Sequence, residues 1–302
     1  MIYTVTLNPA IDYVVRLGGS LQPGGINRSA QEDYEFGGKG INVSRVLHAL
    51  GVSSAALGFV AGFTGEGLEQ GLRGMGLDTR FIRLPEGMTR INVKLKAGEE
   101  TEINGMGPRI SPEDMDRLYA QLETIGEGDV LVLSGSVPAG LPEDTYARIM
   151  ARVSGRGVRV VVDASGPLLE SALALQPFLI KPNHIELGGI FGRTLDTDEE
   201  IESCARSLQA MGARNVLVSM AARGALLLDE HGRTHRIACP AGQVVNSVGA
   251  GDSMVAGFLA GYLESGDYAY ALRLGAAAGS ATAFSVGLAQ REQIERLLAE
   301  SC

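Results

Sequence analysis

Four turn-like segments of the sequence carry residues suited to binding and transferring a phosphoryl group. The most informative is 246–254, NSVGAGDSM, in which small residues precede Asp252 and an apolar stretch follows. The backbone N–H groups of residues 249–252 would point from a helix start at an anion. A carboxylate there opposes anion binding, but it suits a base that takes a proton from an attacking hydroxyl. The alternative is a glycine turn in which Asp252 only caps the helix.

A second glycine turn, FGGKGINVSR at 36–45, also runs into a helix-like stretch. It is not a P-loop, because Lys39 sits among the glycines and no Ser or Thr follows the lysine. A phosphate-binding role for Lys39 is one interpretation. A structural turn with a solvated lysine is the other.

Two further segments directly follow short apolar runs. In 180–186, IKPNHIE, Asn183 and Glu186 offer oxygen ligands that suit Mg²⁺, through water. The alternative is a helix start that Asn183 caps. In 219–224, SMAARG, small residues would give a nucleotide room against the backbone, and an ordinary β-turn is the alternative.

The elements that position these segments alternate between strands and helices. Apolar runs at 2–7, 130–133, 158–162, 178–180 and 216–218 predict buried strands of a parallel sheet. Helix-like stretches lie between them, and Ser111 before Pro112 is a good helix start. This alternation predicts a doubly wound α/β sheet, with the four segments on the edge where such sheets bind ligands.

Residues 11–36 and 88–105 interrupt that alternation with partly polar, period-2 strand patterns. The pattern at 90–96 is expected to pair with 99–104 across a turn at Ala97 and Gly98. We expect both segments to form a small β-sheet lid inserted in a single domain that spans residues 1–302.

Composition excludes several functions. The net charge of −9 argues against nucleic acid or an anionic membrane surface as the main partner. No apolar run is long enough for a membrane span, and the N-terminus does not resemble a signal peptide, so a cytoplasmic location is expected. The three cysteines (Cys204, Cys239 and Cys302) give no disulfide framework, and no histidine spacing matches a zinc site.

The pair GGKGIN and VGAGDSM resembles the ribokinase / phosphofructokinase B family of sugar kinases, and the resemblance covers nearly the whole chain. Within that family the chain is most similar to kinases of fructose 1-phosphate, with tagatose-6-phosphate kinases as near neighbours. The narrower similarity rests on NPAID at 8–12, GKGINV at 38–43, TRINVK at 89–94, SGSVP at 134–138 and KPN at 181–183. The resemblance implies a ribokinase-like, Rossmann-type body with a β-lid.

The resemblance also implies a role for individual residues. Asp252 matches the catalytic base, and Gly249, Ala250 and Gly251 match the anion hole. Positions that hold the sugar match Asp12, Gly38 and Asn42, while Lys39 and Arg90, with Ser136 beside them, match the surroundings of its phosphate. The family positions that bind ATP are matched by Lys181, Asn183, Ser219, Ala222, Gly224 and Ser247. Glu186 matches the acid that organises Mg²⁺. Some members bind a monovalent cation, which here would lie near the carbonyls of Asn246 and Val248 and near Ser285.

Two departures from the family pattern bear on the substrate. Ala221 stands where relatives often have glycine, and its methyl group is expected to tighten the nucleotide pocket. Glu102 stands where kinases of fructose 6-phosphate place a cation, and Lys39 stands where they have glycine. The cationic pocket has therefore moved, which favours fructose 1-phosphate.

We therefore expect ATP-dependent phosphorylation of fructose 1-phosphate at its 6-hydroxyl, giving fructose 1,6-bisphosphate and ADP. The alternatives are a tagatose-6-phosphate kinase and, more remotely, a non-catalytic protein that binds sugar phosphates. An exposed lid sheet would be prone to aggregation unless it is covered, so a homodimer through the lid is expected.

Overall fold

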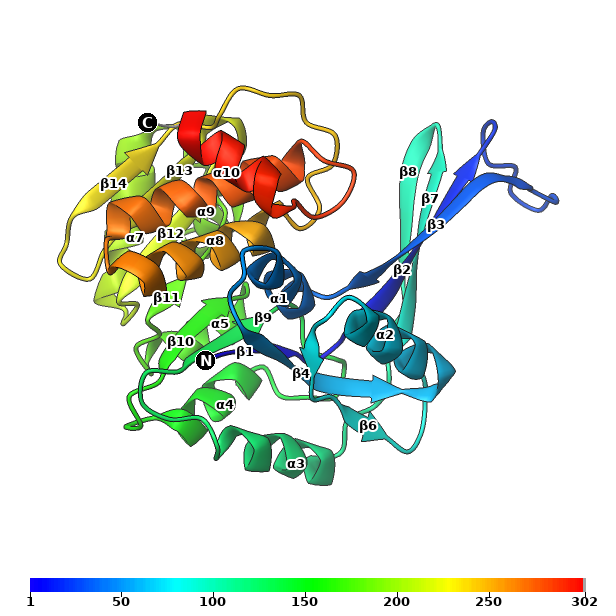
Figure 1. Ribbon diagram of the computed structural model, residues 1–302, viewed down its shortest axis with the longest axis horizontal. Helices are drawn as coiled ribbons and strands as arrows, with labels where there is room; N and C mark the ends of the chain where they lie inside the picture. Colours follow the sequence, from blue (N-terminus) through cyan, green and yellow to red (C-terminus); the bar gives the residue numbers. More distant parts are fainter. Residues whose placement is uncertain (301–302) are drawn as a thin grey trace.

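The computed structural model describes residues 1–300, apart from the side chain of Glu99, and shows two sheets and their covering helices. Cys302 lies outside the described residues. The mixed α/β fold confirms the predicted class, a large central sheet with a second small sheet (Figure 1).

Ten strands of the described chain form the large sheet, in the order β14-β13-β12-β11-β10-β9-β1-β4-β5, with β6 also paired to β4. They are β1 (Ile2–Thr6), β4 (Ser54–Ala61), β5 (Asp78–Thr79), β6 (Ile82–Leu84), β9 (Val130–Ser134), β10 (Arg159–Asp163), β11 (Leu179–Ile180), β12 (Asn215–Ser219), β13 (Ala225–Leu228) and β14 (Thr234–Ile237). All pairs are parallel except β12–β13 and β13–β14. Because β1 pairs with both β4 and β9, the winding direction reverses there, and ligands bind at such switch points.

Helices cover both faces of this sheet, which is why its strands are almost wholly apolar. The helices are α1 (Lys39–Ala49), α2 (Gly62–Gly74), α3 (Pro112–Leu122), α4 (Thr145–Val153), α5 (Pro167–Leu173), α6 (His184–Ile190), α7 (Asp198–Ala210), α8 (Ala250–Ser265), α9 (Tyr268–Ala283) and α10 (Arg291–Glu300), with a 3-10 turn η1 (Ala221–Arg223). One core lies under α3, α4, α5 and α7, and the other under α1, α8, α9 and α10. No helix within residues 1–300 combines the length and hydropathy needed to cross a membrane.

Sequence signals at helix starts are borne out in detail. Ser111 caps α3, and its hydroxyl and the Asp114 carboxylate form a reciprocal capping box before Pro112. The apolar stretch from residue 141 also suggests a helix, but α4 begins only at Thr145. Residues 141–144 form turns instead, one of them closed by the Thr145 N–H to the Pro142 carbonyl.

The small sheet contains β2 (Ala10–Leu17), β3 (Ser29–Gly37), β7 (Arg90–Ala97) and β8 (Glu99–Asn104) in the order β3-β2-β7-β8. It projects from the body beside α1 and α2 (Figure 1). These strands fall in the two segments expected to depart from the βα alternation. β7 and β8 also pair antiparallel across the predicted turn.

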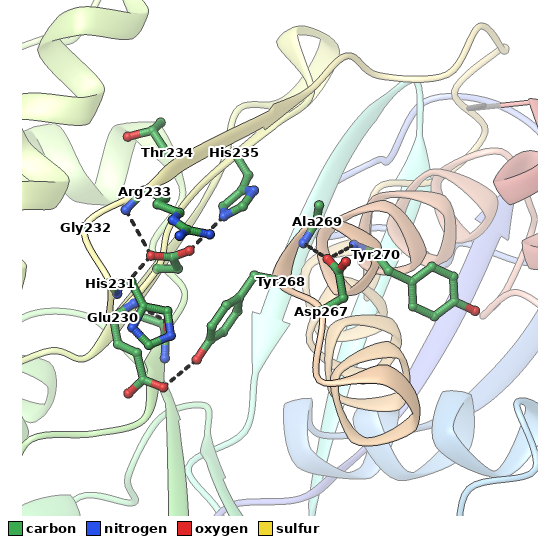
Figure 2. A network of polar contacts seen from close by, with 12 residues as sticks. Glu230, His231, Gly232, Arg233, Thr234, His235, Asp267, Tyr268, Ala269 and Tyr270 are labelled. Atoms are coloured by element: carbon green, nitrogen blue, oxygen red, sulfur yellow. Dashed lines mark hydrogen bonds and ion pairs between the residues drawn. The ribbon is translucent and has the colours of Figure 1, made fainter.

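The turn between β13 and β14 is held by a buried carboxylate (Figure 2). Asp229 accepts hydrogen bonds from the backbone N–H groups of His231 and Arg233, and its other oxygen lies 2.8 Å from Nε2 of His235. Tyr268 at the start of α9 donates to Glu230 at 2.7 Å, which joins this turn to the helix layer. His231 and His235 therefore both belong to the hydrogen-bonded structure of this turn.

Candidate active site

A single cavity of about 1080 Å³ opens at the carboxyl ends of the parallel strands and extends to the small sheet. Every residue predicted from the sequence for catalysis, sugar, nucleotide or Mg²⁺ lines it, whereas Asn246 and Ser285, suggested for a monovalent cation, do not. The predicted residues that line it are Asp12, Gly38, Lys39, Asn42, Arg90, Ser136, Lys181, Asn183, Glu186, Ser219, Ala222, Gly224, Ser247, Gly249, Ala250, Gly251 and Asp252. The tertiary structure thus brings together segments up to 240 residues apart (12 to 252), as expected if they serve one reaction.

Asp252 lies in the first turn of α8, and its carboxylate is buried. The Asn42 side-chain amide, from α1, donates to Asp252 Oδ2 at 2.8 Å. Burial and the nearby negative charge of Asp163 raise the pKa of Asp252 to about 6, against the opposing effects of Asn42 and two lysines. A carboxylate with such a pKa is ionised at neutral pH and is well suited to accept a proton.

The start of α8 is built to receive an anion. Gly249 caps it in the left-handed region (φ 81°), and a Cβ there would lie 2.6 Å from Leu288 Cδ2, so glycine is required. Ala250 donates its N–H to the Ser247 carbonyl at 3.2 Å. Among the described residues, the N–H groups of Gly249, Gly251 and Asp252 have no backbone acceptor. Three of the four amides singled out from the sequence, those of Gly249, Gly251 and Asp252, therefore remain available for an anion, and the Ala250 amide is already used.

Two lysines share a buried carboxylate beside that helix start. Asp163, at the end of β10, lies 3.3 Å from Nζ of Lys39 and 3.4 Å from Nζ of Lys181. A Cβ on Gly251 would lie 3.1 Å from Lys181 Nζ, so this ammonium group borders the anion hole. The negative charges of Asp163, Asp252 and Glu186 outweigh burial and raise the pKa of Lys39.

Lys39 and Arg90 line the same cavity but have different partners. The ammonium group of Lys39 is paired with Asp163, on the side of the cavity that holds Asp252. Arg90 instead comes from β7 and donates to the Asn8 carbonyl at 3.2 Å. The two cations were grouped from the sequence because both stand in family motifs, which do not show side-chain direction.

Asn183 and Glu186 form the capping box of α6. The Asn183 side-chain oxygen accepts from the N–H groups of Ile185 and Glu186, and Glu186 Oε2 accepts from the Asn183 N–H at 2.8 Å. Asn183 thus has the capping role that was the alternative to metal binding, and its oxygen is not free for Mg²⁺. Glu186 Oε1 and the unpartnered, buried Oδ2 of Asp163 are the oxygen atoms that fit such an ion.

The segment after β12 forms η1 rather than a simple β-turn. Ala221 has φ 50°, a left-handed conformation in which a methyl group is strained and glycine is not. This positive φ explains why the family pattern has glycine at this position. The Gly224 N–H donates to the Ala221 carbonyl at 3.0 Å and closes the turn against the cavity.

Residues opposite one another on the small sheet form rungs along its polar face. The inner rung is Ala10 with Arg90, the middle rung is Asp12 with Asn92 and Asn104, and the outer rung is Val14 with Lys94 and Glu102. In the middle rung the Asn92 amide donates to Asp12 Oδ1 at 2.8 Å. Arg90, Asp12, Asn92, Asn104, Lys94 and Glu102 all line the cavity.

Sequence reasoning did not single out Asp163, Asn92, Asn104 or Lys94 as site residues, although all four line the cavity. Asp163 carried a signal, because a polar residue ends an apolar strand at the edge where ligands bind. Asn92 and Lys94 were quoted only as parts of a motif, although their period-2 spacing with Arg90 places all three on one face of β7.

The segment suggested for a monovalent cation lies against the loop after α9. Asn246 donates from its side chain to the Val286 carbonyl at 3.4 Å. The Ser285 hydroxyl donates to the Ala281 carbonyl and accepts from the Gln293 amide at 3.0 Å. Its oxygen is therefore engaged, and the fit is limited to backbone carbonyls near Asn246 and Val248.

Comparison with known proteins places this geometry in context. Residues 3–294 match the family described as pfkB family carbohydrate kinase. The chain is 50% identical to 1-phosphofructokinase of Bacillus subtilis (strain 168) over 300 residues, 99% of this chain and 98% of the relative. It is 39% identical to D-tagatose-1-phosphate kinase of Bacillus licheniformis over 298 residues, 98% of this chain and 97% of the relative.

Comparison with solved structures also finds phosphofructokinases. The chain superposes on phosphofructokinase-2 of Escherichia coli in complex with fructose-6-phosphate with a TM-score of 0.91 and 30% identity, covering 99% of this chain and 98% of that one. The same protein is known in complex with potassium and in a tetrameric inhibited form.

Proposed function

We propose that this chain, which belongs to the pfkB family of carbohydrate kinases, transfers the γ-phosphoryl group of ATP to the 6-hydroxyl of fructose 1-phosphate. The observation that carries the proposal is the buried Asp252 at an anion-binding helix start, in one cavity with Arg90 and Lys94 of the small sheet. The 50% identity to a 1-phosphofructokinase over the whole chain supports the choice of sugar. An intact base argues against a protein that only binds sugar phosphates.

In this mechanism Asp252 takes the proton of the 6-hydroxyl as the hydroxyl oxygen forms a bond to the γ-phosphorus. The bond from that phosphorus to the β,γ-bridging oxygen breaks, and ADP leaves. The amide of Asn42 orients the Asp252 carboxylate toward the hydroxyl. General base catalysis of this kind contributes about 10²–10⁴ in rate.

The charge of the transferring group is met by fixed donors. The N–H groups of Gly251 and Asp252 face the phosphoryl oxygens, and the helix dipole adds positive potential there. Lys181 borders the same place, and Lys39 exchanges its pairing with Asp163 for the incoming phosphate. Ser219, Ala222, Gly224 and Ser247 form the wall along which the nucleotide lies.

Glu186 and Asp163 would hold Mg²⁺ through water, and the ion would neutralise the β- and γ-phosphates when bound. Both residues line the cavity, Asp163 Oδ2 has no hydrogen-bond partner, and ligands shared with phosphates and water suit this ion. Within residues 1–300 no cluster of three or more His, Cys, Asp or Glu could enclose a metal. A potassium ion near the carbonyls of Asn246 and Val248 is proposed by analogy with the potassium complex of phosphofructokinase-2.

The sugar lies between Asp252 and the polar face of the small sheet. Asp12 binds sugar hydroxyls, held by its hydrogen bond from Asn92, and a Cβ on Gly37 would lie 2.6 Å from Asp12 Oδ2. Gly38 and Ser136 flank the ring, and Arg90 offers a cation to the phosphate. The small sheet acts as a lid that excludes water, so that ATP is not simply hydrolysed.

Tagatose 1-phosphate is the second candidate, because relatives at 39% and 34% identity are D-tagatose-1-phosphate kinases. It presents the same phosphate and the same 6-hydroxyl and differs in one hydroxyl orientation. Tagatose 6-phosphate, the earlier alternative, would present its phosphate from the other end.

The apolar face of the small sheet favours a homodimer. Tyr13, Tyr34, Val93 and Ile103 lie opposite one another in the register, and Tyr34 and Ile103 are 64% and 62% exposed. An exposed apolar sheet face of this kind is stabilised by covering it with a second copy.

The decisive experiment is ADP release with ATP and Mg²⁺ over a panel of fructose 1-phosphate, tagatose 1-phosphate, fructose 6-phosphate, tagatose 6-phosphate and fructose. We expect kcat/KM for fructose 1-phosphate to exceed the others at least tenfold, about 1.4 kcal/mol of discrimination. A preference for tagatose 1-phosphate would keep the mechanism and change the sugar. A preference for either 6-phosphate would overturn the proposal.

A further inference from the structure

The three rungs of the small sheet have a direction relative to the catalytic aspartate. Ala10 of the inner rung pairs with Gly37, directly before α1, and Asn42 of α1 holds Asp252. The inner rung is therefore nearest the reaction, and the outer rung is farthest from it. At about 3.3 Å per residue, Lys94 starts about 13 Å along β7 from Arg90.

A sugar substrate that lies along the three rungs, with one end at the inner rung, places its groups at successive rungs. Its acceptor hydroxyl must reach Asp252, and Asp12 of the middle rung takes hydroxyls of the ring. A phosphate on the opposite end of the sugar then extends toward the outer rung, where the long side chain of Lys94 can reach back to meet it.

The outer rung carries an ion pair inside the cavity. Lys94 Nζ lies 3.6 Å from Glu102 Oε1, and the Lys94 side chain is only 13% exposed while that of Glu102 is 45% exposed. Both residues line the cavity. Glu102 can thus turn into water without unfolding anything, whereas Lys94 stays in place.

The next pair along the same hairpin provides a contrast. Lys96 lies 3.6 Å from Glu100, again across β7 and β8, but its side chain is 42% exposed and neither residue lines the cavity. The two pairs share chemistry, distance and strands, and they differ in access to the cavity.

We propose that Lys94 receives the phosphate group of the sugar substrate and that Glu102 is its resident counter-ion, which the phosphate displaces. The inference rests on the proposed function, since it assigns one group of that substrate to one pair of side chains. A phosphate dianion attracts Lys94 more strongly than a half-exposed carboxylate does. A sugar without phosphate cannot displace Glu102, so the pair also selects for phosphorylated sugars. Before substrate binds, Lys94 neutralises the charge of Glu102.

The test is calorimetric binding of fructose 1-phosphate, with and without ADP, to four matched variants. Loss of a charge-assisted contact should make Lys94→Gln bind about 10- to 100-fold more weakly. Glu102→Gln should bind up to about fivefold more tightly, because a half-exposed ion pair no longer competes. Lys96→Gln and Glu100→Gln should stay within about twofold of the wild type.

Turnover adds a second readout. Lys94→Gln should raise KM for fructose 1-phosphate and leave kcat near wild type, since the chemistry at Asp252 is untouched. The proposal is overturned if Lys94→Gln binds like Lys96→Gln, if Glu102→Gln weakens binding, or if the wild type does not bind this sugar phosphate. Thermal unfolding of each variant identifies any that fails to fold, and Lys94→Met then replaces Lys94→Gln.

Failure of the proposed function has a different signature. A wild-type protein that binds fructose 1-phosphate, loses that binding in Lys94→Gln and yet forms no ADP would contradict the reaction and support the phosphate assignment. If the wild type turns over fructose 1-phosphate and Lys94→Gln binds it with an unchanged Kd, the reaction is supported and the phosphate assignment is contradicted.

Discussion

At the scale of single residues, the site depends on carboxylates placed in different environments. Asp252 is buried and held by one amide, whereas Asp163 is buried between two ammonium groups. Burial disfavours the ionised form, and cations restore it. The raised pKa of Asp252 suits it to accept a proton, while Asp163 serves as the partner of Lys39 and Lys181.

Replacing the base should abolish most of the activity. We expect Asp252→Asn to lower kcat by at least about 10²–10⁴, because the amide cannot take the proton of the attacking hydroxyl. Steady-state ADP release measures this loss, with Lys96→Gln as a control that keeps full turnover. A near-wild-type kcat in Asp252→Asn would refute its role as base.

The same substitution should stabilise the fold at high pH. A pKa raised to about 6 from an ordinary 3.8 means that the native state holds the proton longer than the unfolded chain. The wild type therefore loses stability as pH rises from about 4 to about 6, and Asp252→Asn does not. We compare the free energy of unfolding of the variant with that of the wild type at each pH. This difference should shift in favour of the variant by up to about 3 kcal/mol between pH 4 and pH 8. Urea denaturation at both pH values checks this, and a difference that does not change with pH would contradict it.

At the scale of elements, close packing of α8 on α9 holds the anion hole. A Cβ on Gly257 would lie 2.6 Å from the Leu274 carbonyl oxygen and 2.8 Å from Ala278 Cβ. Glycine at this contact lets α9 approach α8 closely, and α8 begins at the catalytic loop. The position of Asp252 thus depends on a contact one and a half turns along the same helix.

Enlarging that glycine should cost stability. Gly257→Ala overpacks a helix contact and is expected to lower the free energy of unfolding by about 1–3 kcal/mol. Gly67→Ala, in the exposed face of α2 with open space around it, should instead raise it by about 0.5–1 kcal/mol. Chemical denaturation compares the two, and equal stabilities would show that α8 can shift to accept the methyl group.

At the scale of the whole molecule, the small sheet has two chemically different faces. Its polar face carries Asp12, Arg90 and Lys94 into the cavity, and its apolar face carries Tyr34 and Ile103 into solvent. A dimer through the apolar face would hold the lid while leaving the site face free. Lid and subunit contact then share one four-stranded element.

A charge on the apolar face should separate the proposed dimer. We expect Ile103→Lys to halve the solution mass measured by light scattering, since an ammonium group would be buried without a partner. Gln31→Lys, which adds the same charge to the polar face of the sheet, should leave the mass unchanged. A wild-type monomer, or an Ile103→Lys variant that keeps the dimer mass, would contradict this assembly.

The sequence by itself determined the fold class, five of the parallel strands and many of the residues that line the cavity, but not β4 or the role of Asp163. Buried parallel strands are apolar on both faces, and glycine turns follow at their carboxyl ends. Both patterns are local and can be recognised in the sequence alone. Local pattern also identified the cap at Ser111 and the pairing of 90–96 with 99–104.

Only the tertiary structure decided which side chains face one another. It paired Lys39 with Asp163, chose the helix-cap role for Asn183, and placed the Lys94–Glu102 pair inside the cavity. Spacing along the chain fixes backbone direction, but it does not show that Lys39 pairs with Asp163, because the two residues are 124 positions apart. Those long-range pairings are set by packing of the whole sheet and its helices, and no local pattern contains them.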